Sequence, residues 1–203
     1  SLRTFATVIS RHIVRDDFII FSDNTTPDES TILYNGEEVT TIANKNLGNR
    51  FIHGYSIDGF SYFSRSLKLN GSLSYVKGDE NETYGPMPSI SPIFGTISGE
   101  YTKDKIKISA LYKFSGDKSP KDYSLGGEDG LEETPVITEN SNGIIYAGTP
   151  KWSDFSIYTN YDISEDVKIR IALTNIFDNH YRTFASGISA PGRSFQVGLY
   201  LKL

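Results

Sequence analysis

Hydrophobic and polar residues alternate with a period of two along much of this chain of 203 residues. Seven segments share the pattern, some cleanly and some with interruptions: residues 50–63, 67–77, 94–101, 105–114, 152–161, 167–177 and 195–203. A further strand is expected near residues 4–15. Side chains of a β-strand point alternately to its two faces, and no segment shows the helical period of 3.6. The pattern therefore predicts an all-β fold, an antiparallel up-and-down meander of about eight strands.

The predicted strands are joined alternately by short and long connections. The short ones lie near residues 64–66, 102–105 and 162–166, and the long ones are residues 78–92, 116–151 and 178–192. Outer-membrane β-barrels have short turns at one end and longer loops at the other. We therefore predict that the short connections lie at one end of the sheet with Leu203, and that the sheet is part of a transmembrane β-barrel.

The alternation also assigns side chains to faces. Eight hydrophobic residues are expected to share one continuous face that is directed at lipid: Ile106, Ile108, Val167, Ile169, Ile171, Val197, Leu199 and Leu201. Four cations are expected on the opposite face, which would line a polar lumen: Lys107, Lys168, Arg170 and Lys202. Five aromatic residues near strand ends suit interfacial girdles, although Tyr and Phe are also simply good strand formers: Phe114, Trp152, Tyr158, Tyr161 and Tyr181.

Composition narrows the function classes. The formal net charge is −5 and the 20 basic residues are scattered, so a nucleic-acid partner is not expected. The chain has no Cys, which leaves neither a disulfide framework nor a thiolate metal site. No stretch approaches the roughly 18 apolar residues of a membrane-spanning helix, and the N-terminus does not read as a signal peptide. The alternating strands of a membrane barrel would escape such a scan, because they average to a mean hydropathy such as the −0.33 found here.

The residue types that could perform catalysis or bind a metal show no suitable spacing. Four carboxylates cluster within residues 126–133: Glu128, Asp129, Glu132 and Glu133. Their spacing fits no calcium-binding loop, and we interpret the run as a solvated loop. The three histidines share no metal-like spacing: His12, His53 and His180. We expect no enzyme activity, no cofactor and no metal site, because no local motif supports Ser-His-Asp catalysis either.

Residues 175–203 carry the most specific motif. An Asn-aromatic-Asp corner is followed by a Tyr-Arg pair, a Pro-Gly-Arg turn and a closing amphipathic strand. The residues are Asn175, Phe177, Asp178, Tyr181, Arg182, Pro191, Gly192 and Arg193. This arrangement resembles the C-terminal signature of TonB-dependent outer-membrane receptors. We expect structural roles for these residues, with the Arg193 guanidinium forking onto a carboxylate such as that of Asp178.

The resemblance implies that residues 1–203 are the C-terminal portion of such a receptor's barrel. The family has an N-terminal plug domain and a barrel of 22 strands, which would need roughly 550 residues. The plug and the earlier strands are therefore expected to be absent here. The resemblance also implies a place in the outer membrane of a Gram-negative cell, in contact with lipid, and import of a scarce nutrient such as an iron chelate. The TonB complex would supply energy through the plug, and the ligand stays unknown. The family usually ends on Phe, where this chain has Leu203.

Two other classes stay open from the sequence. One is a complete small outer-membrane barrel of eight strands with a structural or adhesion role, and the other is a soluble lipocalin-like binding protein. A run of about eight strands from a wider barrel wall would instead have two edges that do not meet, near residues 4–15 and 195–203. Such edges expose unpaired backbone groups, so edge-to-edge self-association is expected in preference to closure into a tighter barrel.

Overall fold

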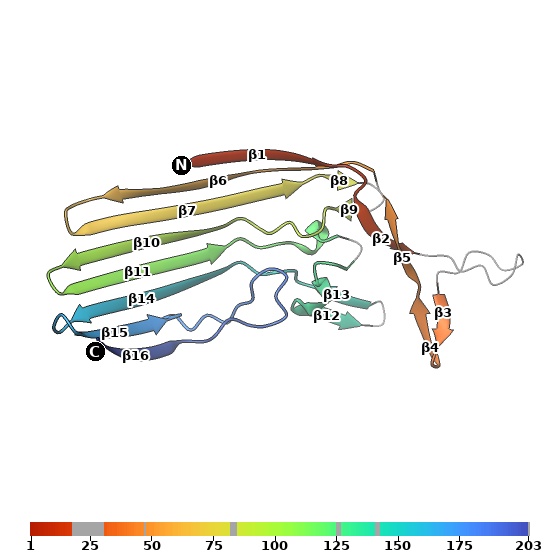
Figure 1. Ribbon diagram of the computed structural model, residues 1–203. Coiled ribbons are helices and arrows are strands. Elements are labelled where there is room, and N and C mark those ends of the chain that lie inside the picture. Colours follow the sequence, from red (N-terminus) through yellow and green to blue (C-terminus); the bar gives the residue numbers. More distant parts are fainter. Residues whose placement is uncertain (18–30, 47, 82–84, 125–126, 141–142, 203) are drawn as a thin grey trace, which may run out of the picture.

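The computed structural model describes residues 1–17, 31–46, 48–81, 85–124, 127–140 and 143–202. Its main feature is one antiparallel sheet of eight long strands (Figure 1). These strands are β1 (Leu2–Ile9), β6 (Arg50–Tyr62), β7 (Leu67–Gly78), β10 (Phe94–Lys103), β11 (Ile106–Ser115), β14 (Trp152–Asp162), β15 (Val167–Thr174) and β16 (Ser194–Leu201). Their order in the sheet is their order in the chain. The predicted all-β up-and-down meander is confirmed.

Connections of different length lie at opposite ends of the sheet. The tight turns after β6, β10 and β14 lie at one end, which we call the turn end, together with the end of β16 (Figure 1). Leu203, which is predicted to lie at this end, is outside the described residues. The described parts of the long connections lie at the other end, which we call the loop end: they fall within residues 10–49, 79–93, 116–151 and 175–193. The predicted separation of short and long connections is therefore confirmed.

The loop end carries small elements that the period-two pattern did not predict. Paired short strands are β2 (Ile13–Asp17) with β5 (Ile42–Asn46), β3 (Thr31–Tyr34) with β4 (Glu37–Thr40), β8 (Glu80–Asn81) with β9 (Gly85–Pro86), and β12 (Val136–Asn140) with β13 (Gly143–Tyr146). Two short 3₁₀ turns, η1 (Pro120–Asp122) and η2 (Leu131–Glu133), lie in the connection between β11 and β14. The β2–β5 and β3–β4 pairs project beyond the sheet (Figure 1).

Two predicted strand ends differ from the structure by three or more residues, and backbone geometry explains both. The strand expected at residues 167–177 ends at Thr174, because Asn175 adopts a left-handed conformation with φ of 47°. The first strand ends at Ile9 and does not run to residue 15, because the chain turns at Arg11, where φ is 55°. The last strand ends at Leu201, two residues before the end of the chain.

The strand registers place the predicted hydrophobic set on one face of the sheet, which we call the apolar face. Across β15 and β16, Ile169 lies opposite Leu199. Tyr161 of β14 lies opposite Ile169 on one side and Ile106 on the other, so the face continues over four strands. The opposite surface, which we call the polar face, carries Lys107, Lys168 and Arg170, whereas Lys202 lies beyond the end of β16.

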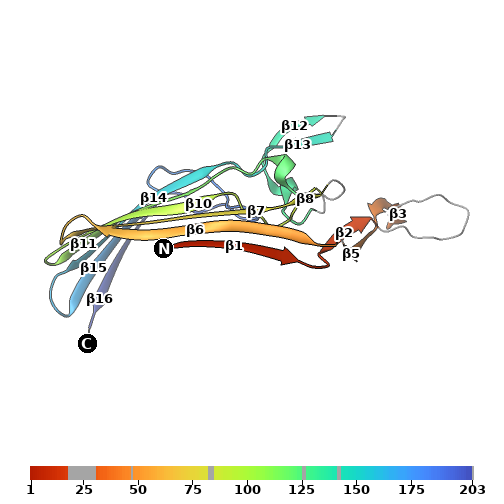
Figure 2. The same ribbon diagram turned by 90° about the horizontal axis from the view of Figure 1, so that it is seen from above.

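The described chain forms an open sheet. β1 and β16 stand at the two ends of the strand order and do not pair with each other. Figure 2 shows the long strands in one curved layer, with β15 and β16 turned away from β1 and β6 at the turn end. On β16 of the apolar face, Val197, Leu199 and Leu201 are 62%, 61% and 61% exposed. The described residues therefore match neither a closed eight-stranded barrel nor a lipocalin-like barrel.

Two glycines allow aromatic rings to lie directly against the sheet backbone. Gly54 of β6 lies opposite Phe5 of β1, and Gly95 of β10 lies opposite Phe114 of β11. A Cβ atom on Gly95 would lie 2.5 Å from the Ser72 carbonyl oxygen and 2.8 Å from Cζ of Phe114. Cross-strand pairs of an aromatic ring over a glycine help to fix the register of neighbouring strands.

Replacing Gly95 with Ala is expected to lower the free energy of unfolding by about 1–3 kcal/mol, because the added methyl group overlaps the backbone and the Phe114 ring. Gly59→Ala is the matched control, because a Cβ atom there meets no atom within 4 Å. That variant should change stability by no more than about 0.5 kcal/mol. The measurement is the urea midpoint of the protein folded in detergent, and equal midpoints for the two variants would contradict this account of the packing.

Candidate functional site

The C-terminal motif folds into a hydrogen-bonded corner at the loop end that is centred on Asn175. This residue is 2% exposed. Its Nδ2 donates to the carbonyl oxygens of Asn179 at 2.9 Å and Pro191 at 3.0 Å, and its Oδ1 accepts from the Asn179 N–H at 3.0 Å. Asn also adopts the left-handed backbone conformation more readily than most residues. One side chain thus connects the start of the last long connection with its end.

Asp178 connects the same corner with the start of β16. Its Oδ1 accepts from the Arg193 backbone N–H at 2.7 Å, and its Oδ2 lies 3.7 Å from Nη2 of Arg193. The contact expected from the sequence is present, but the short hydrogen bond comes from the Arg193 backbone N–H and not from a bidentate guanidinium. A Cβ atom on Gly192 would lie 3.0 Å from Oδ1 of Asp178, so any larger residue here would have to displace that carboxylate slightly.

Two aromatic residues of the motif stack on side chains of β14. Phe177 is 67% exposed and stacks on Phe155, with the ring centroids 5.9 Å apart. The Tyr181 ring stacks on Trp152 with a centroid distance of 4.3 Å, and its hydroxyl donates to Oδ2 of Asp154 at 2.9 Å. The corner is therefore fixed to β14 by stacking as well as by hydrogen bonds.

Asp154 is the centre of a buried polar network on the polar face. Its carboxylate accepts from Ser156 Oγ at 2.8 Å and lies 3.4 Å from Nζ of Lys113. Ser156 Oγ in turn accepts from the Asn175 backbone N–H at 3.2 Å, which joins the network to the corner. Burial, together with the hydrogen bond to the Asp154 carboxylate, raises the pKa of Tyr181 to about 12. The network thus keeps Tyr181 protonated as a donor.

A second buried cluster lies in the connection between β11 and β14. Nζ of Lys118 lies 2.7 Å from Oδ2 of Asp129, and the two residues are 5% and 3% exposed. The Lys118 ammonium also donates to the Ile90 carbonyl at 2.8 Å, and Oδ1 of Asp129 accepts from the Ser89 N–H at 2.7 Å. The interpretation of the acidic run as a solvated loop is therefore wrong for Asp129. Its partner lies eleven positions away in the sequence, and no local pattern marks the pair.

The other carboxylates of that run behave as the sequence suggested. Glu128, Glu132 and Glu133 are exposed. Within the part of the chain that the structure describes, no three His, Asp or Glu side chains are grouped so that they could hold a metal ion. The same part contains no helix with the length and apolar character needed to cross a membrane.

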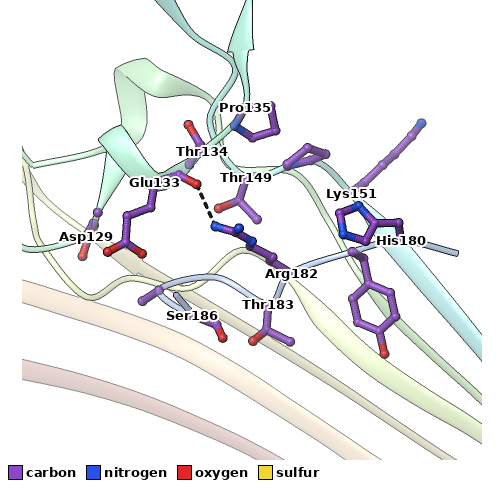
Figure 3. Close-up of a pocket in the computed structure, with 14 residues that line it drawn as sticks. Asp129, Glu133, Thr134, Pro135, Thr149, Lys151, His180, Arg182, Thr183 and Ser186 are labelled. Carbon is purple, nitrogen blue, oxygen red and sulfur yellow. Dashed lines mark hydrogen bonds between the residues drawn. The ribbon is translucent and has the colours of Figure 1, made fainter. Parts of the chain in front are cut away.

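A cavity of about 370 Å³ lies beside the Lys118–Asp129 pair and is bounded by three stretches of the loop end, within residues 129–135, 149–151 and 180–186. Figure 3 shows the Arg182 side chain extending toward Glu133, where Nη1 donates to the Glu133 carbonyl at 3.1 Å. His180 lies beside Tyr181 in the third stretch, and its Nε2 is 3.0 Å from Ser189 Oγ. The volume falls within the lower range of small-molecule sites, and the lining is more apolar than polar, with a few side chains such as Arg182 and His180 that can form hydrogen bonds.

The predicted aromatic girdle is divided between the two faces. Phe114 and Tyr161 lie on the apolar face, as a girdle requires. Trp152 and Tyr158 occupy even-numbered positions of β14 and therefore lie on the polar face, so the prediction is wrong for these two. Tyr181 lies in the last connection, against Trp152.

Comparison with protein-family models and with curated protein sequences finds no match. Solved structures of similar fold include the copper transporter OprC, with 16% identity and a TM-score of 0.64. They also include a mutant of the ferric enterobactin receptor PfeA from Pseudomonas aeruginosa (17%, TM-score 0.66) and the siderophore receptor PirA from Acinetobacter baumannii (16%, TM-score 0.66). Each match covers 98% of this chain and 28–29% of the other.

The chain therefore spans less than a third of the length of the structures that it matches. At these identities the likeness establishes the fold alone. That fold is a sheet of eight antiparallel strands corresponding to part of the barrel of TonB-dependent receptors.

Replacing Asn175 with Ala is expected to lower the free energy of unfolding by about 2–4 kcal/mol, because it leaves buried backbone groups without partners and because Ala tolerates a left-handed φ less well than Asn does. Asn175→Gly removes the same hydrogen bonds without the backbone strain, so it should cost about 1 kcal/mol less. Denaturant unfolding of both variants in detergent measures the difference. A loss below about 0.5 kcal/mol for Asn175→Ala would contradict a central role for this side chain.

The raised pKa of Tyr181 predicts a loss of stability at alkaline pH. The ordinary value is 10 and the folded value is about 12, so the folded state retains the proton more strongly than the unfolded state. The resulting contribution to stability is complete below pH 10 and is lost as the pH rises through about 12. Ultraviolet titration of tyrosinate should show one transition near pH 12 that is missing in Tyr181→Phe. If the substitution Tyr181→Phe instead removed a transition near pH 10, the Tyr181–Asp154 hydrogen bond would be contradicted.

Proposed function

We propose that this chain forms part of the barrel wall and of the outer loops of an outer-membrane receptor that actively imports a scarce nutrient. The observation that carries the proposal is the open, two-faced sheet whose long connections all lie at one end. Proteins of similar fold include a copper transporter, a ferric enterobactin receptor and a siderophore receptor. An iron chelate or a related metal complex is therefore the class of nutrient that we propose.

In this proposal the apolar face contacts lipid and the polar face lines the lumen. A soluble protein rarely exposes a contiguous apolar surface of this extent, whereas membrane-spanning barrels require one. The eight lipid-facing residues are those that the alternation selects: Ile106, Ile108, Val167, Ile169, Ile171, Val197, Leu199 and Leu201. Further strands of the same wall would pair with the open edges of β1 and β16, because an unpaired edge in hydrocarbon costs several kcal/mol per group.

The remaining partners follow from the same proposal. The turn end would face the periplasm and the loop end the exterior, so that the cavity at the loop end meets the arriving nutrient. A plug domain elsewhere in the protein would connect the receptor with the TonB complex. For this chain expressed by itself, edge-to-edge pairing of copies through β1 and β16 stays a prediction.

Two neighbouring substitutions on β16 test the membrane assignment. Val197 lies on the apolar face and Gln196 on the polar face, and both side chains are exposed. Val197→Arg should place a charge in lipid at a cost of about 2–4 kcal/mol and strongly reduce the amount of folded protein in the outer-membrane fraction. Gln196→Arg adds the same charge toward the lumen and should leave that amount nearly unchanged. Equal outer-membrane levels of the two variants would contradict the proposal.

A further inference from the structure

Three stretches bound the loop-end cavity, and we call them its first wall (within residues 129–135), second wall (within 149–151) and third wall (within 180–186). Lys118 contacts all three walls, although it is not among the residues that line the cavity. At the first wall its ammonium pairs with Asp129 at 2.7 Å. At the second wall its backbone exchanges two hydrogen bonds with Thr149, of 2.9 and 3.0 Å. At the third wall the ammonium lies 4.0 Å from the centroid of the Phe184 ring, between the lining residues Thr183 and Ala185. One buried cation therefore lies where the three walls meet.

Neighbouring contacts reinforce this meeting point. The Tyr123 hydroxyl lies 2.6 Å from Oγ1 of Thr149, and the Tyr123 ring packs edge-on against Phe184 at a centroid distance of 6.1 Å. Gly148 has φ of 74°, and a Cβ atom at this position would overlap the Lys118 carbonyl oxygen. The close approach of the two backbones therefore requires glycine at position 148. These contacts join the second and third walls behind the cavity surface.

The same cation also fixes the cavity to a further connection of the sheet. Its ammonium donates to the Ile90 carbonyl at 2.8 Å, and the paired Asp129 accepts from the Ser89 N–H at 2.7 Å. Both of these residues belong to the connection between β7 and β10. The walls of the cavity are thus held against the loop end of the sheet as well as against one another.

We propose that Lys118 is the positioning residue of this cavity, and that its buried ammonium holds the three walls as one preformed unit. The proposal rests on the proposed function in that the imported nutrient would meet this cavity. The three walls then do not close independently around a ligand. A cavity that is already ordered binds with a smaller loss of conformational entropy than one that must assemble.

The energetic reason is the burial of the charge. Removing one partner of a buried pair leaves the other charge without compensation, which is strongly destabilising, whereas an exposed pair is screened by water. The chain offers a matched exposed pair, because Lys107 lies 2.7 Å from Glu100 with side chains that are 43% and 33% exposed. The two pairs have equal separations and differ in burial, so Lys107→Met is the control for Lys118→Met.

Distances between spin labels on the walls test the proposal. The chain has no Cys, so introduced cysteines are labelled selectively. Glu132→Cys with Lys151→Cys reports on the first two walls. Glu132→Cys with Ile188→Cys reports on the first wall and on the segment directly after the third, two residues beyond Ser186. Pulsed electron paramagnetic resonance of the full chain, folded in detergent, should give narrow distance distributions for both label pairs.

The substitutions then have opposite expected effects. Lys118→Met should at least double the width of both distributions, whereas Lys107→Met should leave both unchanged. Lys118→Arg keeps the charge and should retain narrow distributions. Trp152, the single Trp, stacks on the lining residue Tyr181, so Lys118→Met should also raise acrylamide quenching of its fluorescence at least twofold. Unchanged widths in Lys118→Met, or broad ones in Lys118→Arg, would overturn the proposal.

A second variant decides the matter if Lys118→Met does not fold, as judged by far-ultraviolet circular dichroism. Phe184→Leu removes the ring that faces the ammonium at the third wall, together with its edge-on contact to Tyr123. It should widen the 132–188 distribution and leave the 132–151 distribution narrow, and equal widths for both would overturn the proposal. These measurements need neither nutrient nor membrane. A negative result therefore leaves the import function standing, and failure of the Val197→Arg test leaves the cavity result standing.

Discussion

Backbone hydrogen bonding between neighbouring strands is the interaction on which the rest of this structure depends. Each long strand from β6 to β15 is paired on both sides, and β1 and β16 on one. Once that ladder is formed, the alternation of side chains leaves no freedom over which residues face which way. Ile169 must share a surface with Leu199, and Arg170 must lie on the other. The separation into an apolar and a polar face is therefore a consequence of strand pairing.

A sheet with a single layer has no interior of its own, and the distribution of buried residues reflects this. Only a few apolar residues are buried in the described part of the chain, and several of the most buried residues are polar. Arg50 is an example: it is 3% exposed, pairs with Asp79 at 2.7 Å and donates to the Asp79 carbonyl at 2.8 Å. Such groups tolerate burial because they have hydrogen-bonding partners. The loop end is thus held together by buried polar groups that hydrogen-bond to one another.

The C-terminal motif can be understood in the same physical terms. Asn175 combines a left-handed backbone with a side chain that both donates and accepts, and few residue types allow both. Asp178 reaches the Arg193 backbone past Gly192, where a Cβ atom would lie only 3.0 Å from Oδ1 of Asp178. The Tyr181 hydroxyl donates to the Asp154 carboxylate of β14. The motif is a means of ending one long connection and beginning the last strand at a defined position.

The sequence by itself determined the class of fold and which hydrophobic and which charged side chains share a face of the sheet. It also determined that the short and the long connections lie at opposite ends. These properties follow from local alternation and from the spacing between strands, so a single chain contains them. The Asp178–Arg193 contact was also within reach, because both residues belong to one short motif.

Only the tertiary structure decided the strand ends, the small hairpins of residues 10–49, the open edges and the buried polar networks. Asp154 and Tyr181 are 27 positions apart, and Lys118 and Asp129 approach each other only after the connection between β11 and β14 has folded back on itself. An isolated Lys or Asp in a polar stretch looks the same in sequence whether water or a partner surrounds it. Burial decides which, and burial is a property of contacts between segments that no local pattern records.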